Sequence, residues 1–447
     1  MRAQGRRRIG APRRIDRLGV ADDIFWRTHH GMGIPTSMQG LWRFDTMLTA
    51  ADLESTYQGL AAGPLTRRVV RGRIWPARSS FVHGAELAPI HSETEPLPPG
   101  GITEWADARG KTTLNIDTGP VWELSVARLS DGGSVVSLLC SHVVADALSL
   151  VRAVQIASGA APPVDQVNDL PTVADDIRDA ARQLRAVLGG ITRSLWKAMI
   201  NSRRRAELLA AATGSEPKPA KTEGAPDWRE PTAIFSIDLR AWREVAEAHG
   251  GTANTLFTAL IAELVLQVRG SGPVELIIPI SLGRAAGNSL TAATISVSTI
   301  DECRDLAGLR TRARSAFQAA GTGVGIGPPA GMPEELVQVI GHRAAHRLMP
   351  DPGSRDGLAS NLGALDGMLT MLAGHRGRAI AARSVHGGLT GRQCGHTRTS
   401  VAGWAATTAD CLTFCVGTPD PAVARSEDLR LLIDQILARW DLTATYW

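Results

Sequence analysis

Residues 135–151 decide the fold of this chain and read V-V-S-L-L-C-S-H-V-V-A-D-A-L-S-L-V. The mostly apolar run from Val135 to Cys140 predicts a buried strand, and a helical pattern begins at Asp146. His142 therefore lies where a strand gives way to a helix, a place at which rigid elements present a chemical group. A lone histidine at a strand end can also simply bond to backbone, so its role depends on its surroundings.

The sequence on either side predicts how this strand is paired. Residues 119–126 read G-P-V-W-E-L-S-V and alternate as a strand does. A turn signal at 131–133 separates them from the His142 strand, so the two should form a hairpin. In the second half, Thr252 caps a predicted helix at 255–269, and a buried strand at 274–280 precedes Arg284.

The stretch around His142 resembles the H-H-x-x-x-D-G motif of the superfamily of condensation domains and acyl-coenzyme A-dependent acyltransferases. His142 and Asp146 match the second His and the Asp, whereas Ser141 and Ala147 replace the first His and the Gly. The G-P-x-W strand, the helix and strand before Arg284, and an S-N-x-G element at 360–363 extend the resemblance over roughly residues 15–445. The chain resembles most the stand-alone actinobacterial acyltransferases of polyketide or glycolipid products, and next the free-standing condensation proteins.

The resemblance implies an α/β fold of two chloramphenicol-acetyltransferase-like subdomains, set in a V as a pseudo-dimer with a tunnel between them. The first is expected at 15–170, after a disordered basic tail at 1–14. A helical connection and flexible linker should occupy 171–228, because residues 213–227 are rich in Pro, Lys, Gly and Glu. The second subdomain is expected at 229–447.

The resemblance also implies roles for the matching residues. His142 would be the general base that deprotonates an acceptor hydroxyl or amine. Asp146 and Arg284 would pair and hold the histidine loop, although each read alone is an ordinary surface charge. Ser141 and Asn361 are possible substrate contacts. Asn361 is equally typical of a turn, and a Ser141–His142 relay is disfavoured because adjacent strand residues point to opposite faces.

The implied reaction moves an acyl group from a thioester, on coenzyme A or on the phosphopantetheine of a carrier protein, to a hydroxyl or amine on a small molecule. Natural-product or complex-lipid biosynthesis is the expected setting, with no metal and no permanently bound cofactor. The departures at Ser141 and Ala147 leave an alternative, a condensation-like scaffold without catalysis that binds a carrier protein or a product. Replacing His142 separates the two, because only an enzyme would lose turnover.

Composition narrows the classes of function that this chain could have. The 447 residues carry a formal net charge of only +4, which argues against a nucleic-acid binder, and no apolar run approaches the ~20 residues of a membrane helix. Five scattered cysteines without a C-x-x-C predict a reducing cytoplasm. His342 and His346 have the spacing of a zinc pair but lack an adjoining Glu. Residues 203–205, three arginines, would either attract a carrier protein or coenzyme A phosphates or form a solvated helix face.

Overall fold

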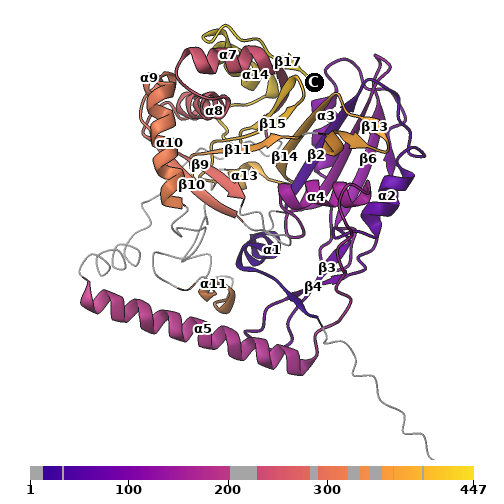
Figure 1. Cartoon of the computed structure of the whole chain (residues 1–447), viewed down its shortest axis with the longest axis vertical. Coiled ribbons are helices and arrows are strands. Elements are labelled where there is room, and N and C mark those ends of the chain that lie inside the picture. Colours follow the sequence, from indigo (N-terminus) through magenta and orange to yellow (C-terminus); the bar gives the residue numbers. More distant parts are fainter. Residues whose placement is uncertain are drawn as a thin grey trace, which may run out of the picture.

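The structure is a computed structural model with two lobes, each built on a β-sheet with helices packed against it (Figure 1). The structure describes residues 14–32, 35–201, 229–281, 290–320, 333, 335–341, 355–365, 367–394 and 397–447. The predicted α/β class is confirmed. Almost all of the predicted N-terminal tail, and the whole linker at 213–227, lie outside the described residues.

The sheet of the first lobe has the predicted hairpin near its centre. Helices α2 (Glu54–Ala61) and α4 (Ala147–Ala157) pack on one face of this sheet, and α3 (Ile102–Gly110) packs on the other. The paired strands of the hairpin are antiparallel, with Trp122 opposite Cys140. The strand order is β14 (Ala379–His386), β2 (Thr36–Phe44), β7 (Ser134–Ser141), β6 (Trp122–Arg128) and β5 (His91–Ser92).

One edge strand of this sheet comes from the second half of the sequence. β14 pairs antiparallel with β2, and Ala382 lies opposite Gly40. Its buried Arg383 forms an ion pair with Asp107 at 2.6 Å and donates to Gln39 Oε1 at 2.8 Å. A buried guanidinium is costly unless it is paired and hydrogen-bonded, so these contacts specify where β14 docks. The sequence did not predict that a strand from the second half would join the sheet of the first lobe.

The second lobe surrounds one helix. α8 (Ala253–Arg269) packs against the sheet, α7 (Leu239–Ala248), α9 (Ile300–Arg304), α10 (Leu306–Ala320) and α14 (Ser426–Ala438). Thr252 caps it, as predicted, by accepting the Thr255 N–H at 3.2 Å. The strand order is β10 (Leu290–Val297), β9 (Val274–Ser281), β11 (Gly357–Ala364), β15 (Val401–Thr408), β16 (Cys411–Gly417), β8 (Thr232–Asp238) and β17 (Thr445–Tyr446).

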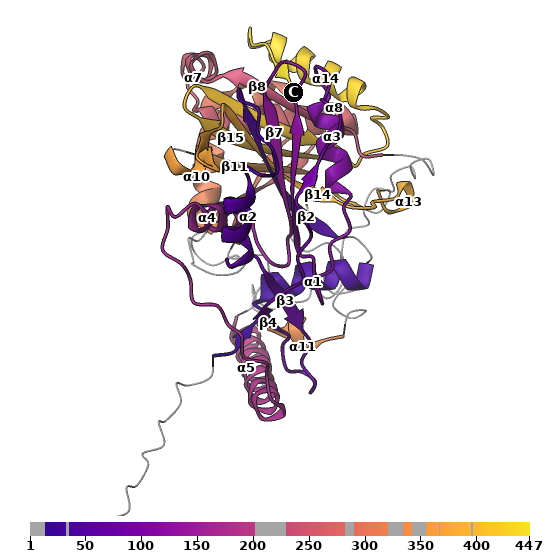
Figure 2. The ribbon, with the colours of Figure 1, turned by 90° about the vertical axis from the view of Figure 1, so that its right-hand side faces the viewer.

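A third group of elements lies below the two lobes (Figures 1 and 2). It contains a small sheet, β1 (Asp16–Arg17), β4 (Ser80–His83) and β3 (Arg67–Val70), and the helices α1 (Val20–Met32), α5 (Val173–Ile200) and α11 (Leu336–Val339). The sequence at 68–71 and 74–75 suggests another strand; β3 confirms its first part, whereas Ile74 and Trp75 lie in a bend and turn. The remaining short elements are η1 (Gly367–Thr370), β12 (Met371–Leu372), β13 (His375–Arg376) and α13 (Gly391–Cys394).

Among the described residues, no single helix is long and apolar enough to cross a bilayer. The bent pair of α7 and α8 is long and apolar enough only when the two helices are taken together. α8 is enclosed by protein: its residues 255–266 are all buried in the second lobe. Gly403 on β15 allows this close packing, because a Cβ there would collide with Ile261 of α8. Packing rather than polarity therefore fixes the position of α8.

Candidate active site

Backbone hydrogen bonds hold His142 at the end of β7. The Ser141 N–H donates to the Val121 carbonyl at 2.9 Å, toward the β6 side of the sheet. The His142 N–H donates to the Thr36 carbonyl at 2.9 Å, on the β2 side. β7 is therefore anchored on both edges up to the residue that carries the imidazole. This is the local order that a group acting on a substrate needs.

The His142 ring is packed as well as anchored. It stacks on the Phe25 ring of α1, with ring centroids 3.7 Å apart and planes inclined by 14°. The residue is 8% exposed. Phe25 thus limits the rotation of the imidazole and covers one of its faces. Sequence reasoning did not predict this contact, because Phe25 is far from His142 in the chain.

A turn carries the chain from β7 to α4, and an arginine holds it. The N–H groups of Val144 and Ala145 both donate to the Ser141 carbonyl, at 2.9 and 3.2 Å. Arg67 Nη2 donates to the Val144 carbonyl at 2.5 Å. The Arg67 guanidinium also lies 3.8 Å from the centre of the Phe81 ring. Arg67 is a supporting residue that sequence reasoning missed, because nothing local links it to a turn 77 residues away.

Asp146 starts α4. Its Oδ1 accepts the Ser149 N–H at 2.7 Å, which makes it the N-cap of the helix, and the residue is buried. Within the described ranges Asp146 forms no ion pair. Its expected partner, Arg284, lies outside the described residues, so the pairing stays a prediction.

Ser141 faces away from solvent. The residue is 1% exposed, and its Oγ accepts the Val143 N–H at 3.4 Å. Its role as a substrate contact stays a prediction. The neighbouring Cys140 thiol is also enclosed, and burial raises its pKa to about 12. Because the thiolate is the reactive form, Cys140 is not a nucleophile at neutral pH.

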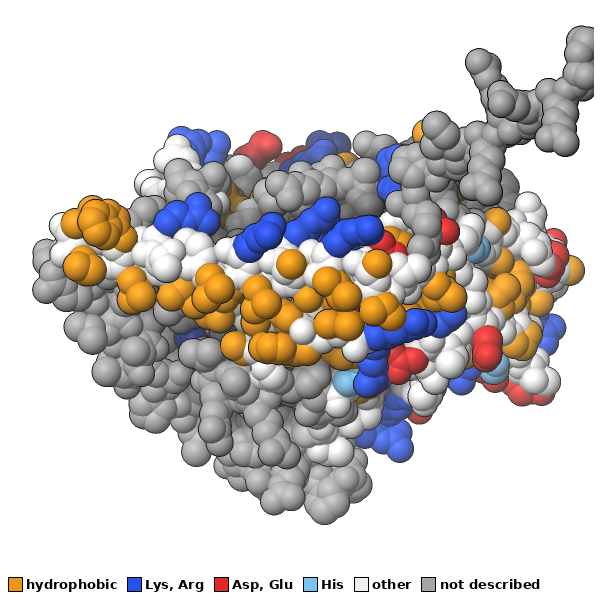
Figure 3. Space-filling model, turned by 90° about the horizontal axis from the view of Figure 1, so that it is seen from below, with side chains coloured by type: hydrophobic (Ala, Val, Ile, Leu, Met, Phe, Trp, Pro, Cys, Tyr) orange, Lys and Arg blue, Asp and Glu red, His pale blue; other side chains and the backbone are white. Residues whose placement is uncertain are grey.

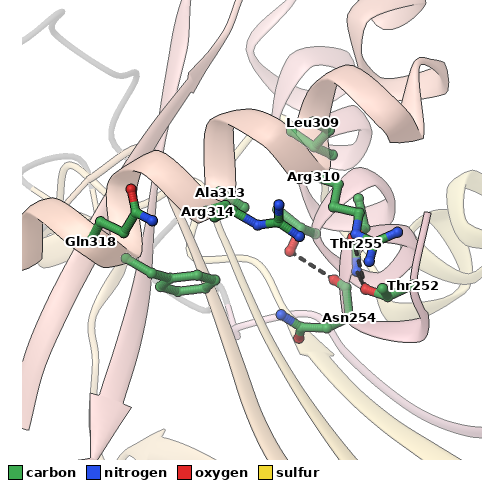
Figure 4. Close-up of a pocket in the computed structure, with 10 residues that line it drawn as sticks. Thr252, Asn254, Thr255, Leu309, Arg310, Ala313, Arg314 and Gln318 are labelled. Atoms are coloured by element: carbon green, nitrogen blue, oxygen red, sulfur yellow. Dashed lines mark hydrogen bonds between the residues drawn. The ribbon is translucent and has the colours of Figure 1, made fainter. Parts of the chain in front are cut away.

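Asn361 joins β11 to the start of α8 within the second lobe. Its Nδ2 donates to Asn254 Oδ1 at 2.9 Å, and its Oδ1 accepts the Gly363 N–H at 2.8 Å. Asn254 lines a pocket of about 400 Å³ between the start of α8 and α10. Arg310 and Arg314 of α10 line the same pocket and extend over it (Figure 4). Asn361 is thus bonded to a residue of a pocket that sequence reasoning did not predict.

A second pocket lies next to α4. Its lining is apolar and includes Trp42 of β2, Leu150 and Val154 of α4, and Leu362 of β11. Its free space is about 20 Å³, enough for roughly one water molecule. A larger molecule could enter only if these side chains moved apart. β11 thus contributes Leu362 to this pocket, and the preceding residue, Asn361, bonds to Asn254, which lines the first pocket.

Known structures share this fold over nearly the whole chain. The wax ester synthase/diacylglycerol acyltransferase from Marinobacter aquaeolei VT8 has a TM-score of 0.57 and 14% identity, covering 95% of this chain and 98% of that chain. The first condensation domain of the CDA synthetase has a TM-score of 0.57 and 15% identity, covering 94% and 93%. A mutant starter condensation domain of rhizomide synthetase, in complex with C8-CoA and Leu-SNAC, has a TM-score of 0.54 and 13% identity, covering 95% of this chain and 94% of that chain.

No protein-family model matches the chain, and no curated protein matches it in sequence. At these identities the likeness concerns the fold alone, and one fold hosts many functions. The chain therefore has the fold that condensation domains share with a wax ester synthase/diacylglycerol acyltransferase.

Proposed function

We propose that this protein is an acyltransferase that moves an acyl group from a thioester to a hydroxyl or amine acceptor, with His142 as the general base. The observation that carries the proposal is the position of His142. It lies at the end of β7, is held by backbone bonds on both edges of the strand, and is oriented by Phe25. The shared fold with condensation domains and a wax ester synthase/diacylglycerol acyltransferase supports the same class of reaction.

In the proposed step, the imidazole accepts the proton of the acceptor O–H or N–H while the acceptor atom attacks the thioester carbonyl carbon. The tetrahedral intermediate then collapses, the carbon–sulfur bond breaks, and the imidazolium returns the proton to the leaving thiolate. The products are an ester or amide and a free thiol, so no net proton is lost. General-base help contributes typically ~10²–10⁴-fold, and holding both substrates in place contributes the remainder.

The donor would be acyl-coenzyme A or an acyl group on the phosphopantetheine of a carrier protein, and the acceptor a small molecule of a natural-product or complex-lipid pathway. Arg310 and Arg314, both exposed at the pocket on α10, support a phosphate-bearing donor. If they bind coenzyme A phosphates, the double variant Arg310→Gln/Arg314→Gln raises KM for acyl-coenzyme A about tenfold or more. The acyl-N-acetylcysteamine thioester, which has no phosphate, should be used equally by both proteins.

The central test is acyl transfer measured by intact mass, with acyl-coenzyme A and acyl-carrier-protein donors against a panel of alcohols and amines. His142→Gln should lower kcat/KM by roughly 10²–10⁴ while the protein stays folded. His375→Gln on the remote strand β13 is the matched control and should keep wild-type turnover. Equal transfer by wild type and His142→Gln would mean that the chemistry lies elsewhere.

The proposed support of the site by an Asp146–Arg284 pair has its own test. Asn is as good an N-cap as Asp, so Asp146→Asn keeps the bond from Ser149 but removes the charge. If Asp146 only caps α4, Asp146→Asn is nearly neutral and Asp146→Ala costs about 1 kcal/mol. If it also pairs with Arg284, Asp146→Asn costs about 3–5 kcal/mol. Urea unfolding of both variants distinguishes the two cases.

A second candidate function is a non-catalytic scaffold that binds a carrier protein or a product. The coverage of His142 by Phe25 and the nearly closed apolar pocket beside α4 favour it. In that case no donor gives transfer, and a carrier protein binds wild type and His142→Gln with the same affinity. Transfer that disappears in His142→Gln would exclude the scaffold.

A further inference from the structure

α5 presents a polar side to the body of the protein. Asp176 forms an ion pair with Arg17 at 2.7 Å, and Asp179 forms one with Arg78 at 2.7 Å. Both aspartates and Gln183 are buried, at a spacing that places them on one side of the helix. Two ion pairs thus help to hold the inward face of this helix.

The apolar side of α5 faces solvent instead. Apolar residues follow one another at intervals of three, four or seven along its whole length, which is the period of a single helix face. Leu188 is 62% exposed, Leu195 is 56% and Met199 is 70%. Figure 3 shows exposed apolar side chains in a stripe across the underside of the molecule. The stripe consists of Val173, Ile177, Leu184, Leu188, Ile191, Leu195 and Met199.

Arginines border this stripe along one edge. Arg178, Arg182, Arg185 and Arg193 are all exposed, and their spacing places them on the strip of helix surface next to the apolar stripe. Figure 3 shows basic side chains along one edge of the stripe. Trp196, 64% exposed, lies near them at the C-terminal end. An apolar face with an arginine-rich border and a tryptophan is the composition of helices that lie in the boundary of a lipid bilayer.

The position of α5 suits contact with a flat surface. The helix is straight and forms the lower edge of the molecule in two perpendicular views (Figures 1 and 2). Its 28 residues give a length of about 42 Å at 1.5 Å per residue. The whole stripe could therefore meet a plane at once.

We propose that α5 docks this protein on an anionic membrane surface, lying flat in the interface. The stripe from Val173 to Met199 would enter the boundary between head groups and acyl chains, and the bordering arginines would contact lipid phosphates. The charge of this border favours an anionic membrane over a second copy of the chain, because two such helices packed side by side would bring like charges together. The inference does not depend on acyl transfer, because binding to a membrane is measured without a reaction.

The test is flotation of the full-length protein with vesicles, either of phosphatidylcholine alone or with about one third phosphatidylglycerol. Wild type should bind the anionic vesicles, and more weakly at high salt. Leu184→Ser/Leu188→Ser/Leu195→Ser should lower the partition coefficient at least about tenfold, because each serine removes exposed apolar surface that the bilayer would bury. Arg182→Gln/Arg185→Gln/Arg193→Gln should remove the preference for anionic vesicles by roughly tenfold or more.

Leu431→Ser is the matched control, since Leu431 is a similarly exposed leucine on α14, at the opposite end of the molecule in Figure 1. It should bind vesicles like wild type, and circular dichroism checks that every variant is folded. Failure of wild type to float with anionic vesicles would overturn the proposal. A wild-type protein that forms a dimer and binds no vesicles, together with a leucine variant that is monomeric, would also overturn it. So would a protein that binds an acidic carrier protein through α5 but does not bind vesicles.

Discussion

α5 and α8 are both long helices with many apolar residues, yet one lies on the surface and the other in the core. In α8, residues 255–266 are all buried, and most of them belong to the apolar core of the second lobe. In α5, the buried residues are confined to one side and include two aspartates, whereas the leucines point outward. The placement of polar side chains around the helix, rather than the number of apolar ones, decides which helix becomes core.

The largest expected contrast compares one leucine from each helix. Leu260 of α8 is 1% exposed and Leu188 of α5 is 62% exposed. Leu260→Ala should lower the free energy of unfolding by about 2–5 kcal/mol, because it removes buried methyl groups and leaves a cavity. Leu188→Ala should change it by less than about 0.5 kcal/mol. Urea unfolding followed by far-ultraviolet circular dichroism measures both, and equal losses would mean that the stripe of α5 is covered in solution.

The two helices also show what the sequence could predict. Thr252 and the helical pattern after it predicted α8, and the apolar run before His142 predicted β7 and its hairpin with β6. These elements follow from local periodicity and caps, which are properties of neighbouring residues. The periodicity of α5 predicted a helix, but the sequence contains no local signal that its apolar side would face outward.

The candidate site was predictable in the same partial way. The sequence placed His142 at the end of a strand and Asp146 at a helix start, and the structure has them there. Phe25 against the imidazole and Arg67 on the turn were missed, because each contact joins residues that are far apart in the chain. The docking of β14 in the first lobe was missed for the same reason, since alternation predicts a strand and not its partner.

The next contrast concerns Asp179, one of the two carboxylates that hold α5. Burial raises the pKa of Asp179, but the hydrogen bonds and the charge of Arg78 outweigh it and hold the pKa below its ordinary value. The stabilisation is therefore present above the ordinary pKa and is lost as pH falls through the lowered one. Asp179→Asn should cost about 1.5–3 kcal/mol at pH 7. This difference from wild type should vanish in acid, and a constant difference at every pH would contradict the assignment.

A buried carboxylate of α8 should behave in the opposite way. Burial raises the pKa of Glu263, although Arg439 and Arg304 act to lower it. Its contribution to stability is fully present below the ordinary pKa and is lost as pH rises through the raised one. Glu263→Gln should therefore be neutral or stabilising by up to about 1 kcal/mol at pH 7. Thermal unfolding at pH 7 tests this, and a loss as large as that of Asp179→Asn would show that the pair with Arg439 outweighs burial.

The smallest expected contrast concerns the two threonine caps. Thr172 accepts the Asp175 N–H at 3.2 Å and donates its own N–H to the Asp175 carboxylate at 2.9 Å, which forms a capping box at the start of α5. Replacing either cap, Thr172 or Thr252, by alanine should cost the local helix about 1 kcal/mol. The enclosed α8 unfolds only with its lobe, so Thr252→Ala should lower global stability by that amount.

α5 can fray at its first turn without disturbing the core, because its anchors to the body begin at Asp176. Thr172→Ala should therefore speed amide hydrogen exchange in the first turn of α5 about fivefold, the equivalent of about 1 kcal/mol. It should leave the global unfolding midpoint within experimental error. Loss of protection along the whole of α5 would instead mean that the helix detaches as one unit, and that the capping box contributes to its docking as much as the ion pairs of Asp176 and Asp179 do.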